Sequence, residues 1–455
     1  MKKIIYSIAT LLSLTGLIVC IFFKSSYYNF NPSNVKKNIE YLSSEELKGR
    51  LSGSSENERV ANEIEGLFKE LNLKPLNNEY KQSFNVNAPI FTGGTPTLKL
   101  LAGESVVQEF KLGDEFKEDM LNFKTTSIQF TKNDKYDIYK SGFAFHKNNE
   151  TYFFTSNLNK ESSFRSSFWN EAPYSFVIEI NIDTFNAILD GIRMGYTLDV
   201  SLPYKVEEKT IYNVCGMIEG TSKDLPPLVF TAHFDHLGAD SLGTVYSGAL
   251  DNASGTAFLF ELAKTFSTLR LPERDIIFVA LNAEEFGLLG SKAFADKYKY
   301  ELSGAEIINF DMVGCEDYPI TMMSSASNLD KTTPLIDSLI EICNNFDIEN
   351  KVTYQDSSDH ASFCNDGFDS LTLSHSNTTN IHTPNDTVDK ISTRGISQVY
   401  EVVECKTIDY AYNNIILIFY NSKTLILFAL TSIALLLIGL VKLKHIVIKD
   451  EDLSA

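Results

Sequence analysis

The feature that most constrains this sequence is an alternation of short apolar runs with amphipathic segments, which begins near residue 210. Residues 227–232 (PLVFTA), 275–282 (DIIFVALN), 305–313 (AEIINFDMV) and 369–375 (DSLTLSH) have the length and apolar content of buried strands. Segments with helical spacing separate them, and strands that alternate with helices form a largely parallel sheet covered on both faces. We therefore predict an α/β fold with three layers, α/β/α, around a largely parallel mixed sheet.

Residues that can bind metal follow the first of these strands. His233 comes directly after it, Asp235 follows two positions later, and Asp251 lies in the turn GALDNASG before a helical segment. Ligands bind at the carboxyl ends of parallel strands, where Asp235 can orient the His233 imidazole. A short carboxylate such as Asp251 can bridge two cations. Taken singly, His233 is more typical of a loop histidine, and Asp251 of a turn or cap residue, than of a metal ligand.

Further candidates follow the other strands. Glu284 and Glu285 come just after residues 275–282, Asp311 ends the next apolar run, and His382 lies in the turn NIHTPNDTVDKI. Adjacent carboxylates beside a buried strand repel each other unless a cation neutralises one of them. Alternation along the backbone points the two in different directions, so one can bind metal while the other faces water. Together these positions predict a metal centre at one edge of the sheet.

Six motifs resemble those of the co-catalytic zinc peptidases of the bacterial leucyl aminopeptidase and aminopeptidase Y type. They are HFDH, GALDNASG, NAEEFGLLGS, NFDMVG, SSDHASF and HTPNDTVDKI, and the resemblance covers about residues 35–84 and 210–411. It implies a zinc-exopeptidase-like fold, two zinc ions per chain, and hydrolysis of the first peptide bond of peptide substrates with a free N-terminus.

The resemblance also implies roles for individual residues. The implied metal ligands are His233, Asp251, Glu285, Asp311 and His382. Asp251 would bridge the two zinc ions, His233 and Glu285 would complete one zinc site, and Asp311 and His382 would complete the other.

Three further positions match the same motifs. Glu284 matches the general base, and Asp235 matches the residue that orients the His233 ligand. Asp359, followed by a histidine, matches a motif that lines the site. Zinc lowers the pKa of bound water to about 7, so a glutamate can take its proton and pass it to the leaving amine.

Three alternatives remain open. A carboxypeptidase or dipeptidase would use the same metal ligands but would differ in the part of the peptide substrate that it recognises. A glutaminyl cyclase shares the fold with one zinc, but residues 252–255 (NASG) follow the peptidase pattern. A receptor-like protein on an inactive scaffold would be expected to lose ligands, and all five ligands are present.

Residues 85–205 differ in character from the rest, with short strand-like runs separated by turn residues. We predict an inserted, mostly β domain that weakly resembles the protease-associated domain, and a peptidase domain made of residues 32–84 and 206–412. We expect the pocket that selects the substrate side chain to be built from loops such as 324–330 and 355–367.

Both ends of the chain are apolar. Residues 4–23 and 424–441 carry no charge and are long enough to cross a bilayer, and lysines lie just outside each run at the chain ends. We predict a signal anchor at 1–23, with a cleaved signal peptide as the alternative, a transmembrane helix at 424–441 and a tail at 442–455. Both termini would be cytoplasmic and the catalytic domain extracytoplasmic. The net charge of −19 argues against nucleic acid as a partner.

Overall fold

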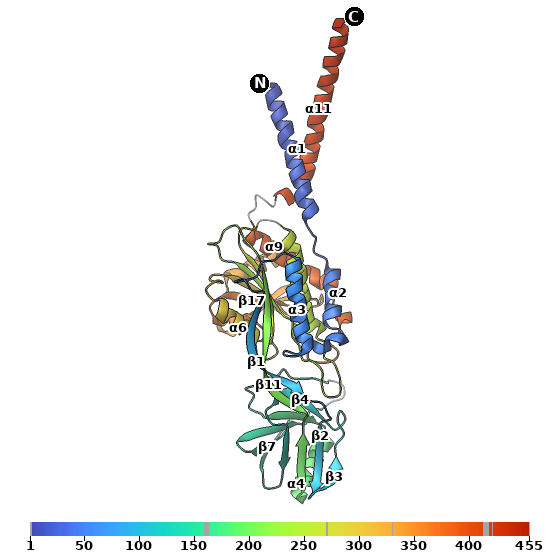
Figure 1. Ribbon diagram of the computed structural model, residues 1–455, viewed down its shortest axis with the longest axis vertical. Helices are drawn as coiled ribbons and strands as arrows, with labels where there is room; N and C mark the ends of the chain where they lie inside the picture. The colour runs from blue at the N-terminus through green and yellow to red at the C-terminus, as the bar shows by residue number, and fades with distance from the viewer. Residues whose placement is uncertain are drawn as a thin grey trace.

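The computed structural model describes residues 2–158, 163–269, 272–329, 331–412, 418–420 and 422–454, with side chains between residues 4 and 442. Asp330, at the end of one expected pocket loop, lies outside the described residues, as do Met1 and Ala455. Three parts follow one another along the long axis: a pair of helices, an α/β part and a β-rich part (Figure 1).

The α/β part is built on one eight-stranded mixed sheet. Its strands, in spatial order, are β1 (Lys81–Phe91), β11 (Tyr204–Ile218), β13 (Ile276–Leu281), β12 (Leu228–His233), β14 (Glu306–Phe310), β17 (Asp369–Ser374), β15 (Ile320–Ser324) and β16 (Asn350–Tyr354). The central strands β13, β12, β14 and β17 are mutually parallel, whereas β1–β11, β11–β13 and β15–β17 pair antiparallel. The predicted α/β class with a large mixed sheet is confirmed.

Helices cover both faces of this sheet because successive strand residues point to opposite sides. Phe230 and Phe278 belong to a core with five helices: α2 (Pro32–Leu42), α3 (Ser55–Glu70), α5 (Gly255–Thr268), α7 (Pro334–Asn345) and α9 (Thr393–Ala411). Val229 and Ile277 face the other way and pack with α6 (Leu289–Tyr298) and α8 (His360–Asn365). The carboxyl ends of the parallel strands stay open between these layers.

Helix α2 ends earlier than the apolar spacing of the sequence suggests. The helical pattern extends over residues 35–47, but α2 stops at Leu42 and a short 3₁₀ segment, Glu45–Arg50, follows. Lys48 and Gly49 have positive φ angles of 41° and 67°, and a Cβ on Gly49 would lie 2.3 Å from the Tyr246 carbonyl oxygen. α2 itself ends at its C-cap, Ser43, and the left-handed turn comes later, just before the buried Arg50.

The β-rich part is entered through β1 and left through β11, which pair over residues 81–91 and 204–214. The expected limits of the inserted domain, 85 and 205, therefore fall inside these two long strands. One sheet contains β4 (Phe116–Phe123), β9 (Phe176–Ile180), β8 (Glu150–Thr155), β7 (Gly142–Lys147) and β6 (Lys135–Tyr139). The other contains β3 (Ser105–Glu109), β2 (Thr97–Ala102), β10 (Thr197–Ser201) and β5 (Ser127–Phe130), with α4 (Ile182–Met194) nearby.

The core of the β-rich part continues into the α/β part. Its buried cluster includes Tyr246 and Phe286, which come from loops that follow β12 and β13. The two parts therefore share packed side chains close to the open ends of the parallel strands.

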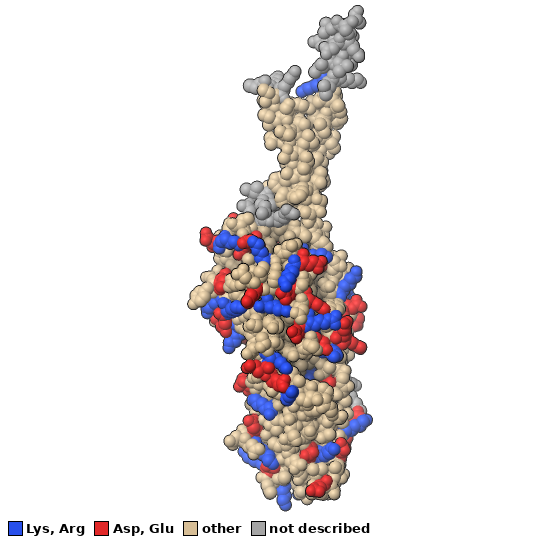
Figure 2. Space-filling model, viewed as in Figure 1, with Lys and Arg blue, Asp and Glu red and all other residues tan. Residues whose placement is uncertain are grey.

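The two terminal helices, α1 (Lys2–Ser26) and α11 (Ser422–Ser454), lie side by side (Figure 1). The hydroxyls of Ser13 and Ser432 are 2.7 Å apart and buried between them. By length and composition, Ile4–Ser26 and Ser422–Lys442 could each cross a membrane. Their surface shows very few charged side chains, in contrast to the rest of the molecule (Figure 2).

Candidate metal centre

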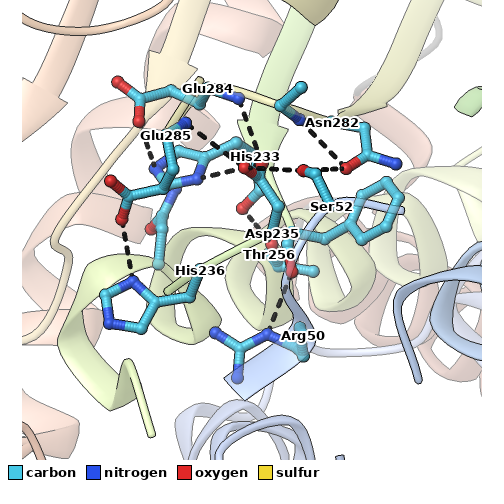
Figure 3. A network of polar contacts seen from close by, with 12 residues as sticks. Arg50, Ser52, His233, Asp235, His236, Thr256, Asn282, Glu284 and Glu285 are labelled. Atoms are coloured by element: carbon cyan, nitrogen blue, oxygen red, sulfur yellow. Dashed lines mark hydrogen bonds and ion pairs between the residues drawn. The ribbon is translucent and has the colours of Figure 1, made fainter. Parts of the chain in front are cut away.

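Asp235 is the centre of a buried polar network at the end of β12 (Figure 3). Its Oδ1 lies 3.6 Å from Nδ1 of His233, the last residue of the strand. The same carboxylate accepts hydrogen bonds of 3.2 Å from the backbone N–H groups of Glu284 and Glu285, and one of 3.1 Å from the Ser52 hydroxyl. Asp235 thus fixes the start of the loop after β13 and lies beside the His233 imidazole, the ligand that it is expected to orient.

Asp251 lies between two imidazoles. Its Oδ1 is 3.5 Å from His233 Nε2, and its Oδ2 is 3.3 Å from His382 Nε2. The Asp386 carboxylate fixes this loop, because it accepts hydrogen bonds from the backbone N–H groups of Leu250, at 2.8 Å, and Asp251, at 3.0 Å. Each carboxylate oxygen of Asp251 can therefore serve a different cation.

Two candidate metal positions share Asp251. The first, which we call the His233 position, is formed by His233, Asp251 and Asp311; His233 Nε2 lies 3.6 Å from Asp311 Oδ1. The second, the His382 position, is formed by His382, Asp251 and Glu285; His382 Nε2 lies 3.4 Å from Glu285 Oε2. All five expected ligands come together.

The expected partition of these ligands was wrong. The resemblance implies that His233 and Glu285 bind one zinc ion and that Asp311 and His382 bind the other. The structure instead places Asp311 beside His233 and Glu285 beside His382. Asp311 directly follows β14, the parallel neighbour of β12, so it stays next to His233. Glu285 lies four residues beyond β13, and the left-handed turn at Ala283, with a φ of 57°, redirects the chain.

The ligand atoms fit a cation. His233 Nε2 and Asp311 Oδ1 are buried and have no hydrogen-bond partner, which is costly unless another group satisfies them. Burial lowers the pKa of His233, but the carboxylates around it, with Glu284 first, outweigh burial and hold it well above its usual value. Glu285 and Asp251 likewise outweigh burial and raise the pKa of His382 to about 11. Imidazole and carboxylate donors suit Zn²⁺, which would supply the missing positive charge.

The surroundings of the adjacent glutamates shift their pKa values in opposite directions. Burial raises the pKa of Glu284 well above its usual value, against the attraction of His233. Burial acts in the same direction on Glu285, but the imidazoles of His382 and His236 outweigh it and hold the pKa of Glu285 well below its usual value. Glu284 Oε2 lies 3.9 Å from His233 Nε2 and faces the cavity. Two carboxylates whose pKa values are pushed apart suit different roles, one as proton carrier and one as ligand.

Sequence reasoning missed His236 as a member of the site, although it stands in the HFDH motif. It is fully buried, and its Nδ1 lies 2.9 Å from Glu285 Oε1, although neither atom has a partner with hydrogen-bond geometry. It can also be grouped with Asp251 and Glu285 as a metal ligand. We assign that place to His382 because His382 faces both carboxylates and lines the cavity, whereas His236 is fully buried and is not among the described residues that line it.

Two other contributors also escaped the sequence reasoning. Arg50 is completely buried and donates to the carbonyl oxygens of Phe234, Ser247 and Gly248, which fixes the loops on either side of the centre. Ser358 precedes Asp359 in the motif that was expected to line the site, and its hydroxyl donates to Asp311 Oδ2 at 2.7 Å. Burial raises the pKa of Asp359 to about 7.

A cavity of about 510 Å³ opens onto the candidate centre. Its carboxylates are Asp251, Glu284, Glu285, Asp311 and Asp356. Apolar contacts come from Leu288, Met312, Met323 and Ile381, and hydroxyls surround them. Among the described residues that line it there is no Lys or Arg. Two loops, 324–330 and 355–367, were expected to form the pocket. The second contributes residues 355–357. From the region of the first, the lining contains Met323, the strand residue just before that loop.

Comparison with known proteins points to one peptidase family. Residues 213–405 match the model of Peptidase family M28. The chain is 29% identical over 230 residues to "Aminopeptidase YwaD" of Bacillus subtilis, which covers 47% of this chain and 48% of that protein. It is 31% identical over 153 residues to "Aminopeptidase NAALADL1" of Mus musculus, covering 32% and 18%. The chain spans about half or less of the length of these curated relatives.

Solved structures share the fold. The zinc aminopeptidase BSAP of Bacillus subtilis superposes with a TM-score of 0.61 at 19% identity, over 85% of this chain and 96% of that one. An aminopeptidase of Aneurinibacillus sp. strain AM-1 gives 0.59 at 20% identity, over 85% and 95%. The match of residues 213–405 to Peptidase family M28, together with the aminopeptidase relatives, confirms the family resemblance inferred from the six motifs.

Proposed function

We propose that this chain, whose residues 213–405 form a peptidase family M28 domain, is a membrane-anchored di-zinc aminopeptidase that acts on peptides outside the cytoplasm. The observation that carries the proposal is the placement of Asp251, whose two carboxylate oxygens face the imidazoles of His233 and His382. Two cations at these positions would neutralise the cluster of carboxylates, and Glu284 stands beside them with its pKa raised.

The residues divide the work as follows. Two zinc ions held by the five ligands would polarise the scissile carbonyl and lower the pKa of the attacking water. Glu284 takes a proton from this water and delivers it to the leaving amine, a role suited to a carboxyl whose pKa is raised. Asp235 keeps the His233 imidazole in one orientation, and Asp386 holds the Asp251 loop in place.

The charge of the cavity favours an aminopeptidase over a carboxypeptidase. A free C-terminal carboxylate is usually bound by Arg or Lys, and the described residues that line the cavity include neither. Asp356 lies at the rim of the same cavity and is not part of either metal position. A carboxylate there suits the positively charged α-amine of a substrate N-terminus.

N-acetylation of a peptide substrate should therefore slow its hydrolysis strongly. Acetylation removes the charge of the α-amine and leaves its acceptors unpaired, at a cost of about 1–3 kcal/mol for each lost group. We expect kcat/KM for one peptide to fall by about tenfold or more in the acetylated form. The measurement compares the two forms by chromatography of the products. Equal rates, or release of the C-terminal residue first, would refute the aminopeptidase specificity and leave the zinc hydrolase intact.

The membrane anchoring is supported by α1 and α11, two long apolar helices that contact each other. Lysines lie at the outer end of each helix in the sequence, at positions 2 and 3 and at positions 442, 444 and 449. Positively charged residues favour the cytoplasmic side of a membrane. Both termini would then be cytoplasmic, and the α/β and β-rich parts would lie on the opposite side.

A reporter fused after residue 455 should consequently behave as cytoplasmic in intact cells. Added protease should digest a tag inserted in an exposed loop of the β-rich part, such as residues 103–104, and should leave the C-terminal reporter intact. The readout is immunoblotting of both tags before and after permeabilisation. Digestion of the C-terminal reporter from outside would disprove the two-span topology.

A further inference from the structure

A short segment of the β-rich part, residues 163–168, contacts the His382 position directly. The backbone N–H of Arg165 donates to the carbonyl oxygen of His382 at 2.9 Å. The Phe164 ring stacks on the His382 imidazole, with ring centroids 5.6 Å apart and an interplanar angle of 27°. The Ser167 hydroxyl donates to Glu285 Oε2, the oxygen that also faces His382. The same segment thus contacts Glu285 and His382, the two ligands that this metal position does not share with the other.

Segment 163–168 is itself firmly held. The backbone N–H of Ser166 donates to Asp119 Oδ1 of β4 at 2.8 Å, and the Tyr246 hydroxyl donates to the Ser163 carbonyl oxygen at 2.9 Å. The Arg165 side chain, only 2% exposed, lies over the Tyr246 ring, 5.4 Å from its centroid. The contacts of segment 163–168 with Glu285 and His382 are therefore preorganised by residues of both the β-rich part and the α/β part.

The His233 position is supported differently. Its terminal carboxylate, Asp311, receives the Ser358 hydroxyl at 2.7 Å, and its imidazole, His233, is oriented by Asp235. Both supporting residues belong to the α/β part. Each metal position thus has one serine that donates to its unshared carboxylate. Ser167 comes from the β-rich part and Ser358 from the α/β part.

We propose that the β-rich part positions one of the two metal ions. Ser167 and Phe164 hold Glu285 and His382 in their ligating orientation, so the His382 position depends on segment 163–168, whereas the His233 position does not. This inference rests on the proposed di-zinc centre. Groups that hydrogen-bond to metal ligands and orient them contribute about 10–100-fold to metal affinity, so the dependence is measurable as metal binding.

The test measures zinc bound by the full-length chain in detergent against a series of chelator-buffered free zinc concentrations. Two backgrounds isolate the positions: Asp311→Ala leaves the His382 position, and His382→Ala leaves the His233 position. In the Asp311→Ala background we expect Ser167→Ala to weaken zinc binding by about 10–100-fold and Ser358→Ala to have no effect. In the His382→Ala background we expect the opposite: Ser358→Ala should weaken zinc binding, and Ser167→Ala should have no effect.

Two further variants separate positioning from general damage. Ser167→Thr keeps a hydroxyl and should restore zinc affinity, and Ser166→Ala, next to it, should leave zinc affinity unchanged because Ser166 is engaged through its backbone N–H. Equal zinc affinity of Ser167→Ala and its parent in the Asp311→Ala background would overturn the inference while leaving the di-zinc proposal intact. A wild-type chain that binds a single zinc ion would overturn both.

Discussion

Glu284→Gln should leave zinc binding intact and remove most of the turnover, by about 10²–10⁴-fold. The amide has the shape of the carboxylate but cannot accept a proton from the attacking water. Glu284 belongs to neither metal position, and its Oε2 lies 3.9 Å from His233 Nε2, beside the centre. Zinc content of the purified full-length chain and kcat with an unblocked peptide, measured on the same preparation, test this expectation.

The neighbouring residue provides the matched control. Glu285→Gln changes the same chemical group one position along the chain, but Glu285 Oε2 faces His382 Nε2 at 3.4 Å and belongs to the His382 position. We expect this variant to lose zinc from that position, and to lose activity as a consequence. If Glu284→Gln loses zinc and Glu285→Gln keeps it, the two roles are assigned the wrong way round.

The fold and the membership of the site could be predicted because both depend on local patterns. The apolar runs around Phe230, Phe278 and Ile308 have the length of buried strands, and each is followed within a few residues by a candidate ligand. Since parallel strands end at the same edge, ligands after different strands converge whatever the detailed register. The sequence therefore indicates that His233, Glu285 and Asp311 lie together.

The partition of ligands between the metal positions could not be predicted in the same way. It depends on which loop reaches which imidazole, and the loop of Glu285 is redirected by the left-handed conformation of Ala283, a residue type with no preference for it. The contact between Ser167 and Glu285 joins residues 118 positions apart and crosses from the β-rich part. No short motif marks such a contact, because a lone serine in a loop is compatible with many environments.

Asp251→Ala should empty both metal positions and abolish peptidase activity. Asp251 Oδ1 and Oδ2 face His233 Nε2 at 3.5 Å and His382 Nε2 at 3.3 Å, so a single side chain contributes a ligand atom to each position. Each remaining pair of ligands, one imidazole and one carboxylate, falls short of the three protein ligands that catalytic zinc sites typically have. Zinc content by atomic absorption, with circular dichroism to verify folding, is the measurement.

Asp356→Ala is the control, because it removes the same kind of side chain from the same cavity without touching either position. Asp356 accepts a hydrogen bond from the backbone N–H of Ala326 at 3.1 Å, and its loss should leave both zinc ions bound. Substitution of Asp311 or of His382 should empty one position only, since each belongs to a single group of ligands. Retention of one tightly bound zinc ion by Asp251→Ala would show that the two positions do not depend on a shared carboxylate, and the bridged centre would have to be abandoned.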